Sequence, residues 1–137
     1  MDKIGSFQYH IDTRLVDYNG QLSLPMLANQ LILSASNHAL TRGFGFGEMQ
    51  GHNSTWVLSR LVVELDTFPR LDDSLTIRTW VEEVGRLFTN RCFVLETAAG
   101  QTIGYARSIW AAIDVETRKP IDLSQLTDLS NYVHDAP

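Results

Sequence analysis

The sequence predicts an α+β fold in which one long helix packs against a curved antiparallel sheet. A single apolar stretch with helical spacing runs from Ser23 to about Arg42, and most of the remaining chain alternates apolar and polar residues as strands do. The strand-like segments are also longer than the usual strand of about five or six residues. Long strands joined by tight turns curve strongly, so the sheet is expected to wrap around the helix.

The segment from Phe7 to Leu15 alternates apolar and polar side chains, which indicates a half-buried strand. A turn at Asp17–Gly20 follows. Ser23 then suits the N-cap of a helix and Pro25 suits its first turn. The helical positions that recur on one broad face are Leu24, Leu27, Leu31, Ala35 and His38. A face of this width predicts a helix that is mostly enclosed.

Glycines at 43, 45 and 47 predict that the helix ends in a flexible loop, which is expected to form a mobile apolar lid. Four strand-like segments follow, at residues 55–68, 74–84, 87–98 and 102–114. Each is followed by a proline, a glycine or a turn sequence, which predicts a meander of consecutive antiparallel strands. The chain is expected to form one domain over residues 1–137, in which residues from about 121 to 137 are an acidic, weakly structured tail.

The composition of the chain argues against several classes of protein. No apolar run approaches the ~20 residues of a membrane span, and the N-terminus has no apolar signal-peptide region. We therefore expect a cytoplasmic protein without a membrane partner. The net charge of −5 argues against a nucleic-acid partner. The single cysteine, Cys92, excludes an internal disulfide, and the histidines lack ligand spacing, so neither a metal ion nor a cofactor is expected.

Three tryptophans occupy similar places in successive predicted strands, and packing within the sheet would explain each of them. Their sequence contexts are more specific. In chain order, the motifs are Trp56-Val57-Leu58-Ser59-Arg60, Thr79-Trp80, Arg91-Cys92-Phe93, Gly104-Tyr105-Ala106-Arg107-Ser108-Ile109-Trp110, Asp114 and Thr117-Arg118-Lys119-Pro120.

Together with Asp17-Tyr18-Asn19-Gly20 and the predicted helix, this ordered set of motifs resembles acyl-acyl carrier protein thioesterases over nearly the whole chain. The resemblance implies the hot-dog fold, in which a curved antiparallel sheet wraps one long helix. It also implies hydrolysis of acyl thioesters of acyl carrier protein or coenzyme A to free fatty acids. Family members usually contain two hot-dog repeats in about twice this length, and the present chain resembles the first.

The family's main catalytic set belongs to the second repeat, where an Asp-x-Asn-x-His run supplies the chemistry. Here the corresponding residues are Asp17, Asn19 and Gln21. Asp17 is the predicted base or nucleophile, and Asn19 and Gln21 are the predicted donors to the oxyanion. Gln21 cannot exchange a proton at neutral pH, which reduces acid–base power. A turn or capping role is the alternative interpretation of Asp17.

The acyl chain is expected to lie between helix and sheet. The predicted substrate-binding residues are Gly20, Leu27, Leu31, Trp56 and Trp80. A homodimer would join two sheets into one and bring each Asp17 loop to the partner interface. A catalytically silent acyl-binding module, or the N-terminal half of a two-repeat thioesterase, is the alternative, and Gln21 in place of histidine favours it. His38 is interpreted as a satisfied interior histidine, and Cys92 as a packing residue.

Overall fold

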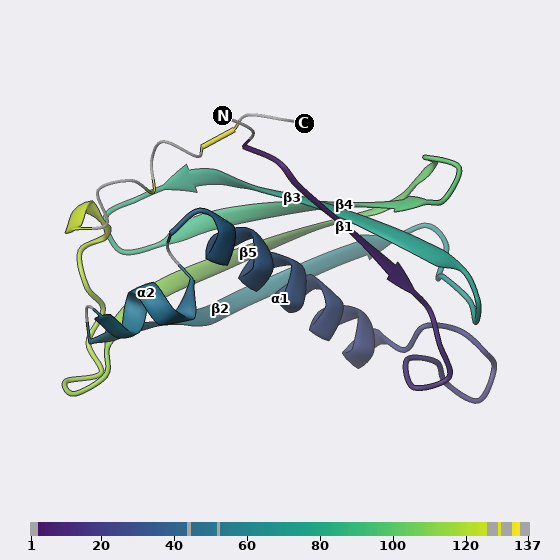
Figure 1. Cartoon of the computed structure of the whole chain (residues 1–137), viewed down its shortest axis with the longest axis horizontal. Coiled ribbons are helices and arrows are strands. Elements are labelled where there is room, and N and C mark those ends of the chain that lie inside the picture. The colour runs from purple at the N-terminus through teal and green to yellow at the C-terminus, as the bar shows by residue number, and fades with distance from the viewer. Residues whose placement is uncertain (1–2, 44, 52, 126–128, 130–132, 135–137) are drawn as a thin grey trace.

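The computed structural model describes residues 3–43, 45–51, 53–125, 129, 133 and 134. In chain order, its elements are β1 (Gly5–His10), α1 (Leu24–Thr41), α2 (Phe46–Gly51), β2 (Ser54–Leu65), β3 (Ser74–Val84), β4 (Thr89–Thr97), β5 (Thr102–Asp114) and the single 3-10 turn η1 (Leu123–Gln125). Helix α1 lies across one face of the sheet (Figure 1). We call this the inner face of the sheet. The predicted α+β class is confirmed.

Helix α1 begins and ends where its sequence predicts. The hydroxyl of Ser23 accepts a hydrogen bond from the amide of Met26 at 3.4 Å, and Pro25 occupies the first turn, where its missing N–H is not needed. After Thr41, the amide of Arg42 donates back to the carbonyl of Ala39 and closes the last turn. The expectation of one long helix is confirmed, but the expectation that it is mostly enclosed is wrong, because Leu24, Leu33 and Leu40 are exposed on its outer side.

The sheet order is β1-β3-β4-β5-β2, with every pair antiparallel. Strands β3, β4 and β5 form the predicted meander. The expectation that the segment before β3 also pairs with β3 is wrong, because β1 occupies that edge, from Gly5 opposite Thr79 to His10 opposite Ser74. Strand β2 instead forms the opposite edge of the sheet, where it pairs with β5 along nearly its whole length.

The first strand is shorter than expected and stops at His10. Beyond it, the amide of Ile11 donates to the carbonyl of Asp73, and residues 12–22 form a loop that leads into α1. Ile11, Leu15 and Leu22 from this region are buried in the core. The alternating pattern after His10 therefore does not reflect a longer strand. Its apolar residues are loop side chains that are buried beneath the start of α1.

The glycine-rich segment after α1 contains a short helix, α2, where a flexible loop was expected. Met49 of α2 is 1% exposed and packs against Ala112 and Leu123. The burial of this side chain outweighs the low helix propensity of the surrounding glycines. Phe44, in the middle of the predicted lid, lies outside the described residues.

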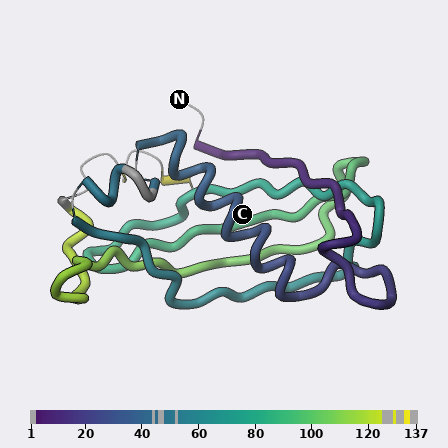
Figure 2. Tube along the Cα trace, turned by 60° about the horizontal axis from the view of Figure 1, so that its bottom comes forward, coloured from purple at the N-terminus to yellow at the C-terminus, as the bar shows by residue number. Residues whose placement is uncertain are grey.

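The main core lies between α1 and the inner face of the sheet. Its residues on α1 are Leu27, Leu31 and Ala35, and its residues on the sheet are Leu75, Ile77, Phe93, Leu95, Ile103 and Ala106. The trace in Figure 2 shows α1 running over the strands with the loop of residues 12–22 at one end of the molecule. No helix in the described part of the chain is long and apolar enough to cross a membrane.

The segment after Ile121 contributes more to the fold than its composition indicates. Leu123 and Leu129 are nearly inaccessible to solvent, and Val133 forms a parallel bridge with Val81 of β3. This bridge lies beyond Thr79, where the pairing of β1 with β3 begins. The described part of the predicted tail is therefore packed against the domain.

Gly104 provides a test of the sheet's register. A Cβ atom at this position would lie 2.5 Å from Leu65 Cδ2 and 2.6 Å from the carbonyl oxygen of Glu64. Because one of these atoms belongs to the backbone, Gly104→Ala is expected to destabilise the protein by about 1–3 kcal/mol. Gly51→Ala is the matched control, since a Cβ there meets no atom within 4 Å. Urea unfolding of both variants measures the difference, and equal midpoints would contradict the register.

Candidate functional site

A pocket of about 260 Å³ lies between the C-terminal half of α1 and the inner face of the sheet. Most of its wall is apolar and consists of Ile32, Ala35, Ala39, Gly45, Trp56, Val81, Trp110 and Leu129. Ser36, Thr55, Thr89 and Arg91 supply the polar part of the lining. Neither Asp nor Glu is among the described residues that line it.

The sequence of α1 explains where the pocket opens. Residues four apart lie on the same side of a helix, and on this side Leu27 and Leu31 are followed by Ala35 and Ala39. The two leucines are completely buried and fill the space above the sheet. The two alanines leave the corresponding space one and two turns later unfilled. The change from large to small side chains therefore creates the cavity.

The two tryptophans of the pocket come from neighbouring strands. Trp56 belongs to the start of β2 and Trp110 to β5, which pairs with β2. The indole N–H of Trp110 donates to Ser108 Oγ at 2.8 Å. This hydrogen bond satisfies the polar end of the ring, so its apolar surface remains available to the pocket.

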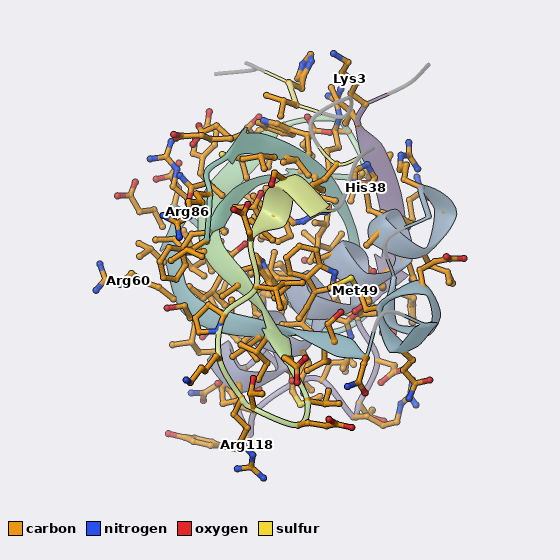
Figure 3. All side chains as sticks on the ribbon, turned by 90° about the vertical axis from the view of Figure 1, so that its left-hand side faces the viewer. Lys3, His38, Met49, Arg60, Arg86 and Arg118 are labelled. Carbon is orange, nitrogen blue, oxygen red and sulfur yellow. The ribbon has the colours of Figure 1, made fainter. Side chains whose placement is uncertain are left out.

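Arg91 of β4 lies between the sheet and α1, and its side chain is almost entirely buried at 5% exposure. One nitrogen, Nη1, donates to Thr79 Oγ1 at 3.1 Å and contacts His38 Nδ1 at 2.8 Å. A guanidinium has only donors, so Nδ1 of His38 accepts and the neutral imidazole carries its proton on Nε2. Figure 3 shows His38 inside the ribbon envelope, while Arg60, Arg86 and Arg118 point outward.

Burial, and to a smaller extent the positive charge of nearby Arg42, lower the pKa of Arg91 to about 10. The guanidinium therefore remains charged at neutral pH. The ion pairs among the described residues involve other basic side chains, namely His10, Arg14, Arg78, Arg86 and Arg107. Within the described part of the chain, Arg91 has no carboxylate partner.

The Asp17 loop lies at the opposite end of α1, before its first residue. One carboxylate oxygen, Asp17 Oδ1, accepts hydrogen bonds from the amides of Asn19 at 2.8 Å and Gln21 at 3.1 Å. Gly20 adopts a φ of 75°, which favours glycine, and its carbonyl accepts from the amide of Leu71. The turn is thus stabilised by its own hydrogen bonds and is hydrogen-bonded to the loop before β3.

Arg70 fixes the other side of this loop. Its Nη2 donates to the carbonyl of Asn19 at 2.7 Å, and Gln21 forms a backbone bridge with Arg70. The residues of α1 that line the pocket extend from Ile32 to Ala39. At 1.5 Å per residue, they lie about 14 to 24 Å along the helix axis from the loop.

The structure brings together only some of the residues predicted to form a site. Trp56 lines the pocket, and Asp17, Asn19, Gly20 and Gln21 share one loop at the other end of α1. Leu27 and Leu31 belong to the main core rather than to the pocket wall.

Trp80 lies on the face of the sheet away from α1, where it lines a second hollow with Tyr105 and Arg107. Its neighbour Thr79 hydrogen-bonds Arg91 on the inner face, and successive strand residues point to opposite faces. The predicted acyl-binding residue Trp80 is therefore separated from the pocket by the sheet.

Sequence reasoning missed Arg91 as a site residue. Strand alternation places Arg91 on the same face as Phe93 and Leu95, both of which are buried in the core. A charged residue at a core position of a strand is rare unless it is paired. This pattern was the available signal.

Two other predicted roles concern Cys92 and metal binding. Burial raises the pKa of the Cys92 thiol, which lies near Glu82 Oε2 at 3.3 Å, so its local environment does not favour a reactive thiolate. Among the described residues, no group of three or more His, Cys, Asp or Glu side chains could hold a metal ion.

Comparison with known proteins identifies the family. The acyl-ACP thioesterase N-terminal domain family matches residues 4–127. Oleoyl-acyl carrier protein thioesterase 2 of Arabidopsis thaliana is 32% identical over 120 residues, which are 82% of this chain and 32% of that protein. The chain thus spans about a third of the length of this curated relative.

Solved structures agree with this assignment. An acyl-ACP thioesterase from Bacteroides thetaiotaomicron is 43% identical, with a TM-score of 0.91 over 98% of this chain and 55% of that chain. A DHNA-CoA thioesterase from Staphylococcus aureus shares the fold, with a TM-score of 0.85 at 17% identity over 94% of this chain and 87% of that chain. The helix-and-sheet arrangement is therefore the hot-dog fold, and the chain belongs to the acyl-ACP thioesterase N-terminal domain family.

Proposed function

We propose that this chain hydrolyses acyl thioesters of acyl carrier protein or coenzyme A to free fatty acids. The observation that carries the proposal is the apolar pocket between α1 and the inner face of the sheet, in a chain of the acyl-ACP thioesterase family. Apolar pockets with few polar groups are the usual sites for such ligands. The acyl chain lies against Trp56, Trp110 and the helix positions Ala35 and Ala39.

Catalysis at this pocket needs a group that one chain alone does not bring to it. Asp17 lies before α1, whereas the pocket lies beside the second half of the helix. A second hot-dog unit supplies the missing loop. This unit is another copy of the chain in a homodimer.

The edge strand β2 is the natural place for this pairing. It is 12 residues long, it has a neighbour on only one side, and Val57 and Val62 are exposed on it. An edge of this kind is a template for another strand. A register shift between Leu58 and Arg60 divides the edge into two parts, so the pairing uses one of them more fully.

A two-fold axis between two β2 strands makes the two α1 helices antiparallel. The N-terminal end of one helix then lies on the side where the other helix ends. The pocket borders β2 through Thr55 and Trp56, so it faces the partner's Asp17 loop across the interface. In this arrangement the Asp17 loop of each unit supplies the catalytic residues for the pocket of the other unit.

The loop geometry suits Asp17 to act as a base. Both backbone amides bind Oδ1, and Oδ2 accepts no hydrogen bond from the described residues. Oδ2 takes a proton from water as the water oxygen attacks the thioester carbon. The side-chain amides of Asn19 and Gln21 stabilise the oxyanion, because the backbone N–H groups of Asn19, Gly20 and Gln21 already donate to Asp17. The thiolate then leaves and takes a proton from solvent, because Gln21 cannot donate one.

The carrier end of the substrate is anionic, whether it is an acidic carrier protein or the phosphates of coenzyme A. Exposed arginines such as Arg60 and Arg86 point outward from the domain (Figure 3). Attraction between exposed charges is screened by salt. The affinity for the carrier end therefore falls as ionic strength rises.

A second function is favoured by two observations. The chain spans only about a third of the length of its curated relative, and the position of the family's catalytic histidine is Gln21. Under this alternative the domain binds acyl chains without hydrolysing them, or it works beside a second repeat that carries the catalytic residues.

Asp17→Asn separates the catalytic role from the turn role. Asparagine retains an oxygen that accepts from the amides of Asn19 and Gln21, so the loop is preserved, but it is not a base at neutral pH. We expect the hydrolysis rate of decanoyl-CoA and of long-chain acyl carrier protein to fall by about 10²- to 10⁴-fold. Thiol release from the full chain measures the rate.

Asp66→Asn is the control, because Asp66 is an exposed aspartate outside the loop, and its rate should remain within about twofold of the wild type. Full activity of Asp17→Asn would eliminate Asp17 as the catalyst. Wild-type protein that binds acyl ligands but shows no turnover at any chain length would establish the silent binding domain instead.

Pairing through β2 is tested by replacing both exposed valines of its edge with lysine. Val57→Lys/Val62→Lys is expected to weaken the dimer by about tenfold, because like charges across paired strands are destabilising. Val115→Lys is the control, since Val115 is also exposed but lies beyond β5. Sedimentation over a dilution series measures the dissociation constant. A wild-type protein that is monomeric at every concentration would contradict the homodimer.

A further inference from the structure

The pocket contains a buried positive charge that the described residues do not neutralise. Arg91 lines the pocket at 5% exposure. No carboxylate among the described residues pairs with it, and neither Asp nor Glu is among the described lining residues. A buried charge is strongly unfavourable unless it is paired and hydrogen-bonded. The site is therefore incomplete without an anion.

The guanidinium retains donors for such a partner. Both hydrogen bonds to protein groups are made by Nη1, to Thr79 Oγ1 and His38 Nδ1. Nε and Nη2 have no hydrogen-bond partner in the described part of the chain. The fork of an arginine matches the two oxygens of a carboxylate, and such charge-assisted pairs are among the strong hydrogen bonds of proteins.

The surroundings of Arg91 hold its guanidinium in place. Thr79 and His38 fix the guanidinium from the sheet and from α1, and His38 is neutral because its Nδ1 accepts. A Cβ on Gly5 would lie 2.5 Å from His38 Cδ2, so the imidazole is packed closely against β1. The anion thus meets a donor that is held in place from two sides.

The remainder of the pocket selects an apolar body for this anion. Its walls present Trp56 and Trp110 from the sheet and Ile32 from α1. An apolar cavity of about 150 Å³ accepts benzene. On the same scale, the pocket of about 260 Å³ accepts roughly ten carbon atoms.

We propose that the pocket is a binding site for the anion of a medium-chain fatty acid, with its carboxylate on Arg91 and its chain between the two tryptophans. The free acid is the product of the proposed hydrolysis, and here it binds with its carboxylate inside the domain. It shares the pocket with the proposed function but requires no turnover. Bound acid therefore excludes an acyl chain from the same pocket and acts as a product inhibitor.

The test compares two ligands of equal chain length on the full wild-type chain. Decanoate carries the charge and decanol does not. We expect decanoate to bind with one site per chain and about ten- to one-hundredfold more tightly than decanol, because it adds hydrogen bonds to a charged group. Calorimetry measures both, and quenching of tryptophan fluorescence reports occupancy. Equal affinities, or no binding of decanoate, would overturn the proposal.

Arg91→Met assigns the preference to one side chain. It keeps an unbranched side chain without charge, and replacing a buried charge by an apolar group is often tolerated. Decanol binding should persist while the preference for decanoate is lost, and Arg91→Lys should retain part of that preference.

Arg118→Met is the matched control, since Arg118 points outward on the surface (Figure 3) and the variant should keep the full preference for decanoate. If Arg91→Met fails to fold, the comparison of decanoate with decanol on the wild-type protein still tests whether the pocket prefers the anion. Retention of the full preference by a folded Arg91→Met protein would overturn the assignment. Because all readouts are binding, a protein without hydrolysis leaves this test intact.

Discussion

The packing of one helix against the inner face of five strands is the constraint on which the rest of the molecule depends. Helix α1 is the main element that covers this face, and its sheet-facing side changes from Leu27 and Leu31 to Ala35 and Ala39. The leucines complete the core beside the start of the helix. The alanines leave a pocket beside its end. A single amphipathic stripe thus divides the helix–sheet interface into a half that stabilises the fold and a half that can hold a ligand.

The two halves also differ in polarity. The core beside Leu27 and Leu31 is apolar, whereas the pocket is lined by Arg91, whose guanidinium contacts Thr79 and His38. A buried cation in a cavity contributes little to stability by itself. It makes sense as part of a binding site, where the ligand supplies the opposite charge. The fold-stabilising and ligand-binding roles therefore fall on neighbouring turns of the same helix.

Local patterns predicted much of this fold. Ser23 and Pro25 located the start of α1, and the bounds of β3 and β5 agree with the alternating segments and their turns. The strand that pairs with β2 could not be predicted from local patterns, because strand pairing is non-local and no turn sequence specifies it. Helix α2 was missed because its formation depends on burying Met49 rather than on propensity. The pocket depends on register, which alone brings Arg91 of β4 opposite His38 of α1.

In the proposed homodimer, the Asp17 loop of each unit acts at the pocket of the other unit. Mixing two inactive variants of the chain tests this arrangement most directly. Asp17→Asn keeps the pocket and loses the base, and Ser36→Trp blocks the pocket at an exposed lining residue while keeping Asp17. Mixed dimers then contain one complete site, so equal amounts of the two chains should regain about one quarter of wild-type acyl-CoA hydrolysis after subunit exchange. A mixture that never exceeds the sum of its two parents would contradict a shared site.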